Sequence, residues 1–144
     1  YARAYMRMKD YEQFQLHGMV EILLSYFIKH AEPRLIIKDD RILKLIGYIS
    51  EHVSENITVA TLADISCLTE SHLVKAFRKE LGVTPLQYII KKRIQHAQTL
   101  LLGTEMTVSE VSQSAGFTDS SYFVRLFKRH IGYTPQQYRD RLIG

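Results

Sequence analysis

The sequence predicts an all-α fold in which one helical unit occurs twice. Residues 57–64 read ITVATLAD and residues 106–113 read MTVSEVSQ, and residues 73–88 and 123–138 then match over a longer stretch. No segment of convincing length alternates apolar and polar residues, which is the pattern of a half-buried strand. A short helix, a turn and a longer helix with Lys and Arg are typical of a helix-turn-helix unit, and two such units can enter two successive DNA grooves.

The composition sets broad limits on the class of protein. With 144 residues, of which 46% are hydrophobic, the chain can bury one or two small cores and is globular. Its formal charge of +4 is compatible with a polyanionic partner. The single cysteine, Cys67, excludes an internal disulfide, and no run of about 18 apolar residues predicts a membrane span. Because nothing resembles a signal peptide, we expect a cytoplasmic protein, and Tyr1 in place of Met suggests a piece of a longer chain.

Residues 1–38 are expected to be the tail of an upstream sensing or dimerisation domain, followed by a linker. From about Phe14 to His30, apolar residues recur at helical spacing and predict an amphipathic helix. The candidates for a dimer contact on its apolar stripe are Leu16, Met19, Leu23 and Phe27. The same stripe fits a terminal helix packed on its own domain, so both interpretations stay open.

A DNA-binding domain is expected over residues 39–144. Asp39 and Asp40 start its first helix, whose apolar positions are Ile42, Leu45, Ile46, Ile49 and Val53. We expect the first helix-turn-helix unit at about residues 58–81 and the second at about 107–131. A long connecting helix over about residues 85–102, ending near Gly103, joins the two units.

Start and stop signals for the helices occur in matched pairs. Thr58 and Thr107 are candidate N-caps, and Glu110 completes a Thr-x-x-Glu capping box in the second copy. Gly82 and Gly132 fall where the longer helices must end, as expected of a left-handed residue just past a helix end. Two Thr-Pro-x-Gln segments, at residues 84–87 and 134–137, place Thr at the cap, Pro first and Gln third in the next helix.

The residues of the second copy form a long and specific motif. It reads Gly116-Phe117-x-Asp119-x-Ser121-Tyr122-Phe123-x-Arg125-x-Phe127-Lys128, followed by Gly132-x-Thr134-Pro135-x-x-Tyr138-Arg139. This motif resembles the signature of the AraC/XylS family of bacterial transcription regulators, and the resemblance covers about residues 40–142. Cys67 stands where the first turn often has Gly, and Ser112 stands where Ala is usual. Both side chains are small, so we expect the helix pairs to close normally.

The resemblance implies a homeodomain-like fold of two helix-turn-helix subdomains joined by the connecting helix. It also implies sequence-specific binding to double-stranded DNA and a sensing or dimerisation domain upstream. Members of the family often activate transcription by touching RNA polymerase, so the resemblance favours an activator.

The two longer helices have candidate base-reading faces. The helix expected at residues 70–81 buries Leu73, Ala76 and Phe77, and the helix expected at residues 120–131 buries Phe123, Leu126 and Phe127. Spacing of i, i+3, i+4 and i+7 puts the remaining key residues on the opposite faces. The base-reading candidates are Ser71, Val74, Lys75, Arg78, Ser120, Ser121, Val124 and Arg125.

These residue types suit a groove of DNA. Arg125 can bond guanine O6 and N7 together, Val124 can touch a thymine methyl, and serines can bond base edges or phosphate. Lys75 can take the guanine role with less geometric definition than arginine. The phosphate candidates are Thr58, His72, Lys79, Thr107, Lys128 and Arg129. For the two threonines, backbone N–H groups and the helix dipole supply the attraction.

The alternative interpretation of each face is that it is an ordinary solvent-exposed helix surface without a binding role. Two copies that share caps, core and cation placement make that interpretation much less favoured than it is for one copy. The Lys91-Lys92-Arg93 run lies on the connecting helix, where a solvated or core-bracing role is favoured over DNA contact.

Other classes of protein fit poorly. The histidines are scattered, at His17, His30, His52, His72, His96 and His130, without metal-ligand spacing. Cys67 is favoured as a packed turn residue over a nucleophile, and no phosphate loop is present, so we expect no enzyme, metal or cofactor. A helical protein-interaction module that acts through the apolar helix at residues 14–30 remains the alternative. A gel shift at rising salt separates the two, because DNA binding must weaken steeply.

Overall fold

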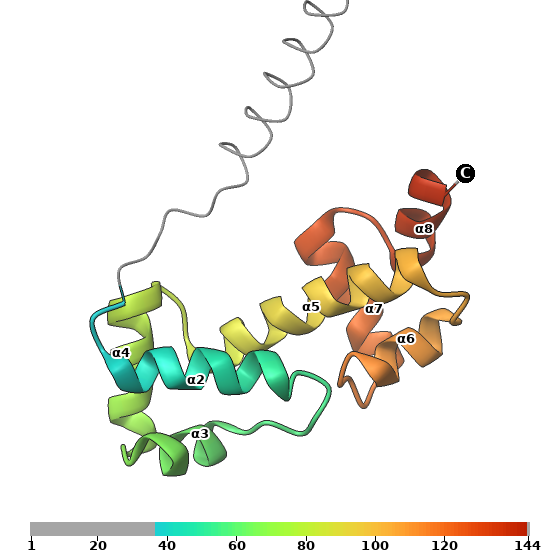
Figure 1. Ribbon diagram of the computed structural model, residues 1–144. Coiled ribbons are helices and arrows are strands. Elements are labelled where there is room, and N and C mark those ends of the chain that lie inside the picture. Colours follow the sequence, from blue (N-terminus) through green and yellow to red (C-terminus); the bar gives the residue numbers. More distant parts are fainter. Residues whose placement is uncertain (1–36, 144) are drawn as a thin grey trace, which may run out of the picture. The chain divides into compact units, whose positions relative to one another are not determined.

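The computed structural model describes residues 37–143, and this part of the chain contains seven helices and no strand. They are α2 (Asp40–Glu51), α3 (Val59–Ser66), α4 (Glu70–Leu81), α5 (Pro85–Gly103), α6 (Val108–Ser114), α7 (Ser120–Ile131) and α8 (Pro135–Ile143) (Figure 1). The prediction of an all-α fold with two helix-turn-helix units is confirmed: α3 and α4 form one unit, and α6 and α7 form the other. The amphipathic helix expected at residues 14–30 lies outside the described residues.

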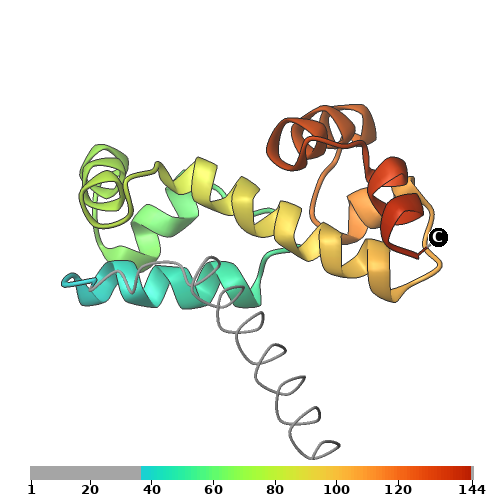
Figure 2. The same cartoon turned by 90° about the horizontal axis from the view of Figure 1, so that it is seen from above.

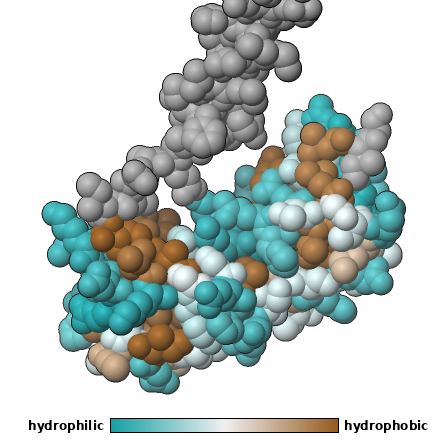
Figure 3. All heavy atoms as spheres, viewed as in Figure 1, coloured by the Kyte–Doolittle hydropathy of each residue, from teal (hydrophilic) through white to brown (hydrophobic). Residues whose placement is uncertain are grey.

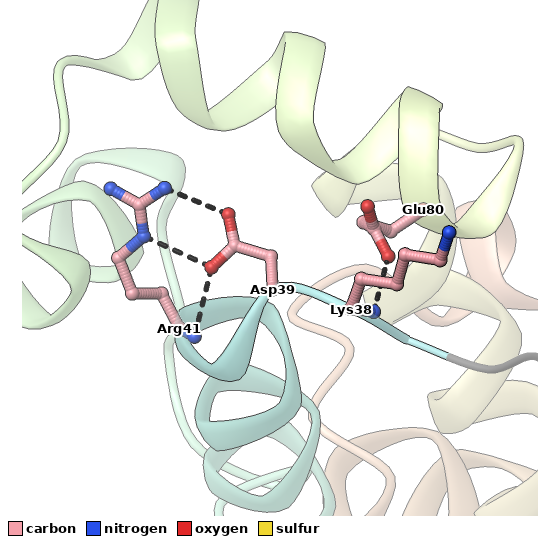
Figure 4. Close-up of polar contacts among 4 residues, drawn as sticks. All are labelled: Lys38, Asp39, Arg41 and Glu80. Atoms are coloured by element: carbon pink, nitrogen blue, oxygen red, sulfur yellow. Dashed lines mark hydrogen bonds and ion pairs between the residues drawn. The ribbon is translucent and has the colours of Figure 1, made fainter.

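Helix α2 begins at the aspartates, as expected. The Asp39 carboxylate caps it by accepting the Arg41 backbone N–H at 3.0 Å, and it also pairs with the Arg41 guanidinium at 2.8 Å (Figure 4). The inclusion of Val53 in this helix was wrong, because α2 ends at Glu51 and His52 already has non-helical angles. The chain turns there, and the Val53 carbonyl accepts a hydrogen bond from a side chain of α5 instead of an intrahelical one.

Two hydrophobic cores share the connecting helix. The first core joins α2, α3 and α4 with Ile89 of α5, and the second joins α6 and α7 with Ile94, Ala97 and Leu101 of α5. In each core a tyrosine packs edge-on against a buried phenylalanine: Tyr88 on Phe77 at 5.9 Å and Tyr138 on Phe127 at 5.5 Å between ring centroids. The two copies of the repeated sequence therefore pack around their cores in the same way.

The expected caps are present in both copies. The Thr58 hydroxyl accepts the Thr61 N–H at 3.0 Å, and Thr107 forms a full capping box with Glu110. Thr84 with Gln87 and Thr134 with Gln137 form matched bonds at the starts of α5 and α8. The glycines that end α4 and α7 have left-handed φ angles, 72° at Gly82 and 89° at Gly132.

The turns inside the two units differ. Cys67 and Gly116 occupy equivalent places after the first helix of each unit, and both are left-handed, with φ of 53° and 86°. The prediction of a packed Cys67 was wrong, because its side chain is exposed and Leu68 packs against the first core in its place. Ser112 is fully buried in α6, and its hydroxyl has no hydrogen-bond partner within the described residues.

The surface is mixed in polarity. Figure 3 shows separate hydrophobic patches among hydrophilic residues over both units. The large exposed apolar side chains include Leu43, Ile65, Leu86, Leu102, Tyr122, Tyr133 and Leu142. Scattered apolar residues of this kind are normal on a protein surface. Among residues 37–143, no helix has the length and apolar character that crossing a bilayer demands.

Candidate nucleic-acid interface

The second helices of the two units, α4 and α7, lie on the same side of α5 and near its opposite ends (Figure 2). Their predicted bounds, residues 70–81 and 120–131, are those observed. Five of the six residues expected to anchor them are buried: Leu73, Phe77, Phe123, Leu126 and Phe127. The sixth, Ala76, is half-buried and packs at the edge of the first core. Burial of these side chains fixes which face of each helix is turned outward.

The outer face of α7 carries only positive charge. Ser121, Arg125 and Lys128 are exposed, and Val124 is half-buried against the second core. Helix α7 contains no acidic residue, and its last turn holds Lys128, Arg129 and His130. Within residues 37–143, the side chains of Arg125 and Lys128 have no hydrogen-bond or ion-pair partner, so both cations are available to a ligand.

The outer face of α4 has the same layout but mixed charge at one edge. Ser71, Lys75 and Arg78 are exposed, and Val74 is half-buried. Lys79 lines a shallow hollow together with the acidic residues Asp39, Asp40 and Glu80 and the basic residues Lys38 and Arg41. The Glu80 carboxylate accepts the Lys38 backbone N–H at 2.8 Å (Figure 4). The charges around Lys79 are thus mixed, whereas α7, which carries its counterpart Arg129, contains no acidic residue.

The first turns of α4 and α7 expose polar groups. His72 is exposed, and its ring Nδ1 lies 3.0 Å from the hydroxyl of the capping Thr69. Asp119 caps α7 by accepting the N–H groups of Ser121 and Tyr122. Ser120, in contrast, is half-buried, and its hydroxyl lies 3.4 Å from that of Ser109 in α6. Ser120 therefore faces α6, whereas Ser121 belongs to the exposed face.

The starts of α3 and α6 offer different environments to an anion. At α6 the Glu110 carboxylate accepts the backbone N–H of Thr107 at 2.7 Å and its hydroxyl at 2.8 Å. The backbone bond, then the hydroxyl bond, hold the pKa of Glu110 below its ordinary value. The negative charge of the Glu110 carboxylate is thus fixed beside Thr107. The first turn of α3 after Thr58 has no acidic residue, so it is the better place for a phosphate.

Two residues have roles that sequence reasoning did not assign. Tyr122, the counterpart of His72, is 44% exposed beside Ser121 at the start of α7. Arg139 donates from α8 to the carbonyls of Leu101 and Met106, at 3.0 and 2.6 Å, and so holds the loop after α5. The signal for Tyr122 was its place in the repeat, next to a predicted face residue. For Arg139 the sequence offered only its place in the motif.

Arg93 braces the structure from α5, one of the two roles favoured for its basic run. It donates from Nε to the Val53 carbonyl at 3.2 Å and from Nη2 to the Glu55 carbonyl at 2.6 Å. Burial lowers the pKa of the Arg93 guanidinium. Lys92 lies 5.5 Å from the Tyr88 ring centroid, a contact within α5 itself. Neither contact extends the candidate DNA-binding faces.

Comparison with known proteins identifies the same region. A family model described as a helix-turn-helix domain matches residues 62–141. The arabinose operon regulatory protein of Escherichia coli (strain K12) is 36% identical over 102 residues, which is 70% of this chain and 35% of that protein. In this and several other curated relatives, the match covers only 19 to 38% of the relative's length.

Solved structures agree with the fold. The DNA-binding domain of AdpA, a global transcriptional factor solved in complex with a target DNA, has a TM-score of 0.69 and 30% identity. The match covers 72% of this chain and 93% of that domain. The xylose-binding transcription activator xylR has a TM-score of 0.64 and 31% identity, covering 72% of this chain and 27% of that chain. These proteins are regulators of an operon or of transcription, and one of them was solved on its target DNA.

Proposed function

Because the chain belongs to the AraC/XylS family and is a transcriptional regulator with an AraC-type DNA-binding domain, we propose that it reads a bipartite DNA site. In this proposal α4 and α7 enter two successive major-groove segments of one duplex. The observation that carries the proposal is that both helices lie on one side of α5 (Figure 2). Each of them has exposed cations on its outer face. Successive segments on one side of B-DNA are about 34 Å, or about 10 base pairs, apart.

Base reading is proposed for the exposed centre of each helix face. The guanidinium groups of Arg125 and Arg78 are exposed and have no partner within residues 37–143, which favours bidentate bonds to guanine. Ser71, Lys75 and Ser121 flank them, and the half-buried Val74 and Val124 offer methyl groups at the edge of each face. Ser120 is a weaker candidate because its hydroxyl faces α6.

Phosphate contacts are proposed around these centres. His72, Lys128 and Arg129 are exposed at the ends of the two helices, and Thr58 opens the acid-free first turn of α3. Lys79 is a further candidate in a hollow of mixed charge, and Thr107 is a weaker one because Glu110 occupies the start of α6. Such contacts orient the protein on the duplex without reading its sequence.

The test is the dependence of affinity on the spacing between half-sites. A high-affinity site is first selected from random duplexes with the full 144-residue chain, and about 5 or about 10 base pairs are then inserted between its halves. An insertion of about five base pairs turns one half-site to the far side of the duplex. An insertion of about ten base pairs returns that half-site to the same side but increases the distance between the two half-sites. We expect both insertions to weaken binding, since one rigid unit cannot reach either site. Unchanged affinity would mean that only one helix-turn-helix unit binds DNA.

Further partners are proposed from the family and from the residues outside the described part. We propose activation through contact with RNA polymerase in the cytoplasm, and control by an effector that binds a domain upstream. We also propose pairing of two chains through Leu16, Met19, Leu23 and Phe27, which lie outside the described residues. Sedimentation of the intact protein should show a dimer that Leu23→Glu weakens. A monomer before and after that change would rule the pairing out.

A further inference from the structure

One side chain in the middle of α5 holds a loop of the first unit. Arg93 lies between Ile89, which belongs to the first core, and Ile94, which belongs to the second. Its guanidinium donates to the carbonyls of Val53 and Glu55, at 3.2 and 2.6 Å, in the loop between α2 and α3. Two carbonyls thus accept from one planar cation, whose donors are fixed in direction.

The turn of the second unit meets the same place. A Cβ built on Gly116 would lie 2.8 Å from the Val53 carbonyl oxygen and 2.9 Å from Arg93 Nε, which is closer than real Cβ atoms approach. The ring of Phe117, buried in the second core, has its centroid 5.8 Å from Arg93 Cζ. The loop after α2, the middle of α5 and the turn after α6 therefore touch one another at Arg93.

The close approach at Gly116 belongs to the junction and not to the helix-turn-helix unit. The first unit has Cys67 where the second has Gly116, and the Cys67 side chain is exposed. A side chain is therefore accommodated at this place when no neighbouring unit lies against it. The close approach at Gly116 arises from where the second unit sits on the first.

We infer that Arg93 is a positioning residue that holds the second helix-turn-helix unit against the first and so sets the half-site spacing that the protein accepts. This inference rests on the proposed bipartite reading of DNA. Helix α5 alone can bend or twist between its two cores, and a small bend at its middle is a large displacement at its ends. The bonds of Arg93 lie off the helix axis and resist that bend, because both acceptors are backbone atoms of a loop packed on the first core.

The first experiment measures the separation of α4 and α7 without DNA. Spin labels are placed at the exposed, equivalent positions of Lys79 and Arg129 in a Cys67→Gly background, and their distance distribution is recorded by pulsed dipolar spectroscopy. We expect a narrow distribution for the parent and a broader or shifted one for Arg93→Ala. Lys92→Ala is the matched control, because it removes a neighbouring cation that lies over the Tyr88 ring of the same helix.

The second experiment measures affinity against a panel of sites whose half-sites differ in spacing by single base pairs. Arg93→Ala should bind the best site about tenfold more weakly, since the second reader is held less firmly at its half-site. It should also discriminate less between spacings. Lys92→Ala should keep the parent's preference for one half-site spacing, even if the lost charge lowers its affinity for all sites slightly. Arg93→Lys, which retains the charge but cannot reach two carbonyls equally, should behave more like Arg93→Ala than like the parent.

The outcomes separate this inference from the proposed function. A parent-like distance distribution and a parent-like spacing profile in Arg93→Ala would overturn the inference. If the parent itself shows no spacing preference, the bipartite reading is wrong, and the spin-label distances still decide whether Arg93 positions the second unit. If circular dichroism shows that Arg93→Ala is unfolded, Arg93→Gln, which keeps one donor, is compared with the parent in the same two measurements.

Discussion

Replacing Gly116 by alanine tests the contact between the two units directly. Three glycines have left-handed φ angles in residues 37–143, and two of them, Gly82 and Gly132, have open space where a Cβ would stand. Gly116 does not: a Cβ there would lie 2.8 Å from a backbone carbonyl oxygen, which cannot move without moving its loop. Alanine at these glycines therefore separates the effect of the backbone angle from the effect of the collision.

The expected magnitudes follow from these two effects. A left-handed alanine costs roughly 1 to 2 kcal/mol, and the stiffer unfolded chain offsets about 0.4 to 1 kcal/mol of that. Gly132→Ala should thus lower the free energy of unfolding by about 1 kcal/mol. Overpacking adds about 1 to 3 kcal/mol, so Gly116→Ala should lower it by about 2 to 4 kcal/mol. Cys67→Gly removes a left-handed side chain without any collision, so it should change the free energy of unfolding by less than about 1 kcal/mol.

The assay is urea denaturation followed by far-ultraviolet circular dichroism. Midpoints are compared at equal slopes, because a changed slope would indicate altered exposure of surface and not altered stability. The predicted order of stability is Cys67→Gly at or above the parent, then Gly132→Ala, then Gly116→Ala. Equal losses for Gly116→Ala and Gly132→Ala would refute the reasoning, since they would mean that the turn after α6 has free space beside the loop after α2.

Four further substitutions test other parts of the structure. Arg125→Ala should cost roughly 1 to 3 kcal/mol of binding and relax preference at one base position, whereas Lys79→Ala should weaken all sequences about equally; competition assays with single-base variants of a selected site measure both. An unchanged affinity for Arg125→Ala would mean that the face of α7 is wrongly phased. Ser112→Ala should raise the free energy of unfolding by about 1 to 2 kcal/mol, since it removes a buried hydroxyl that has no partner within the described residues, and thermal or urea unfolding that shows a loss would contradict this. The pKa of Asp39 is held at about 2, below its ordinary 3.8, first by the hydrogen bond from the Arg41 side chain. Its stabilising effect is therefore complete above about pH 4 and is lost as the pH falls toward about 2, because the unfolded chain takes up the proton first. Asp39→Asn should remove this part of the acid dependence of unfolding, and an identical acid profile in Asp39→Asn would show that the pair contributes nothing.

The helix bounds could be predicted because the signals that set them are local. A threonine or aspartate cap bonds an N–H two or three residues away, and a left-handed glycine ends its own helix. Helices α4 and α7 accordingly begin and end at the predicted residues. Helical periodicity likewise identified most of the buried side chains, since Leu73 and Phe127 face their cores wherever the rest of the chain lies.

Contacts between elements were less accessible from sequence. Val53 continues the apolar spacing of α2, yet the helix ends before it, because the loop that contains Val53 is held by Arg93 of α5. Ser120 shares a helix with Ser121 but faces Ser109 of α6. Lys79 is phased toward the candidate face, yet lines a hollow with the start of α2. In each case a neighbour distant in sequence decides the environment.

The duplication itself explains why the contact between the two units could not be predicted from the sequence. Comparing two copies reveals what they share, which here is the caps, the cores and the cationic faces. A contact between the copies involves different surfaces of each, so it has no counterpart in the repeat. Gly116 and Cys67 illustrate this: both must be left-handed, but only Gly116 lies against another unit, so only Gly116 is excluded from carrying a side chain. A departure from the repeat at such a position therefore marks where the two copies have different neighbours.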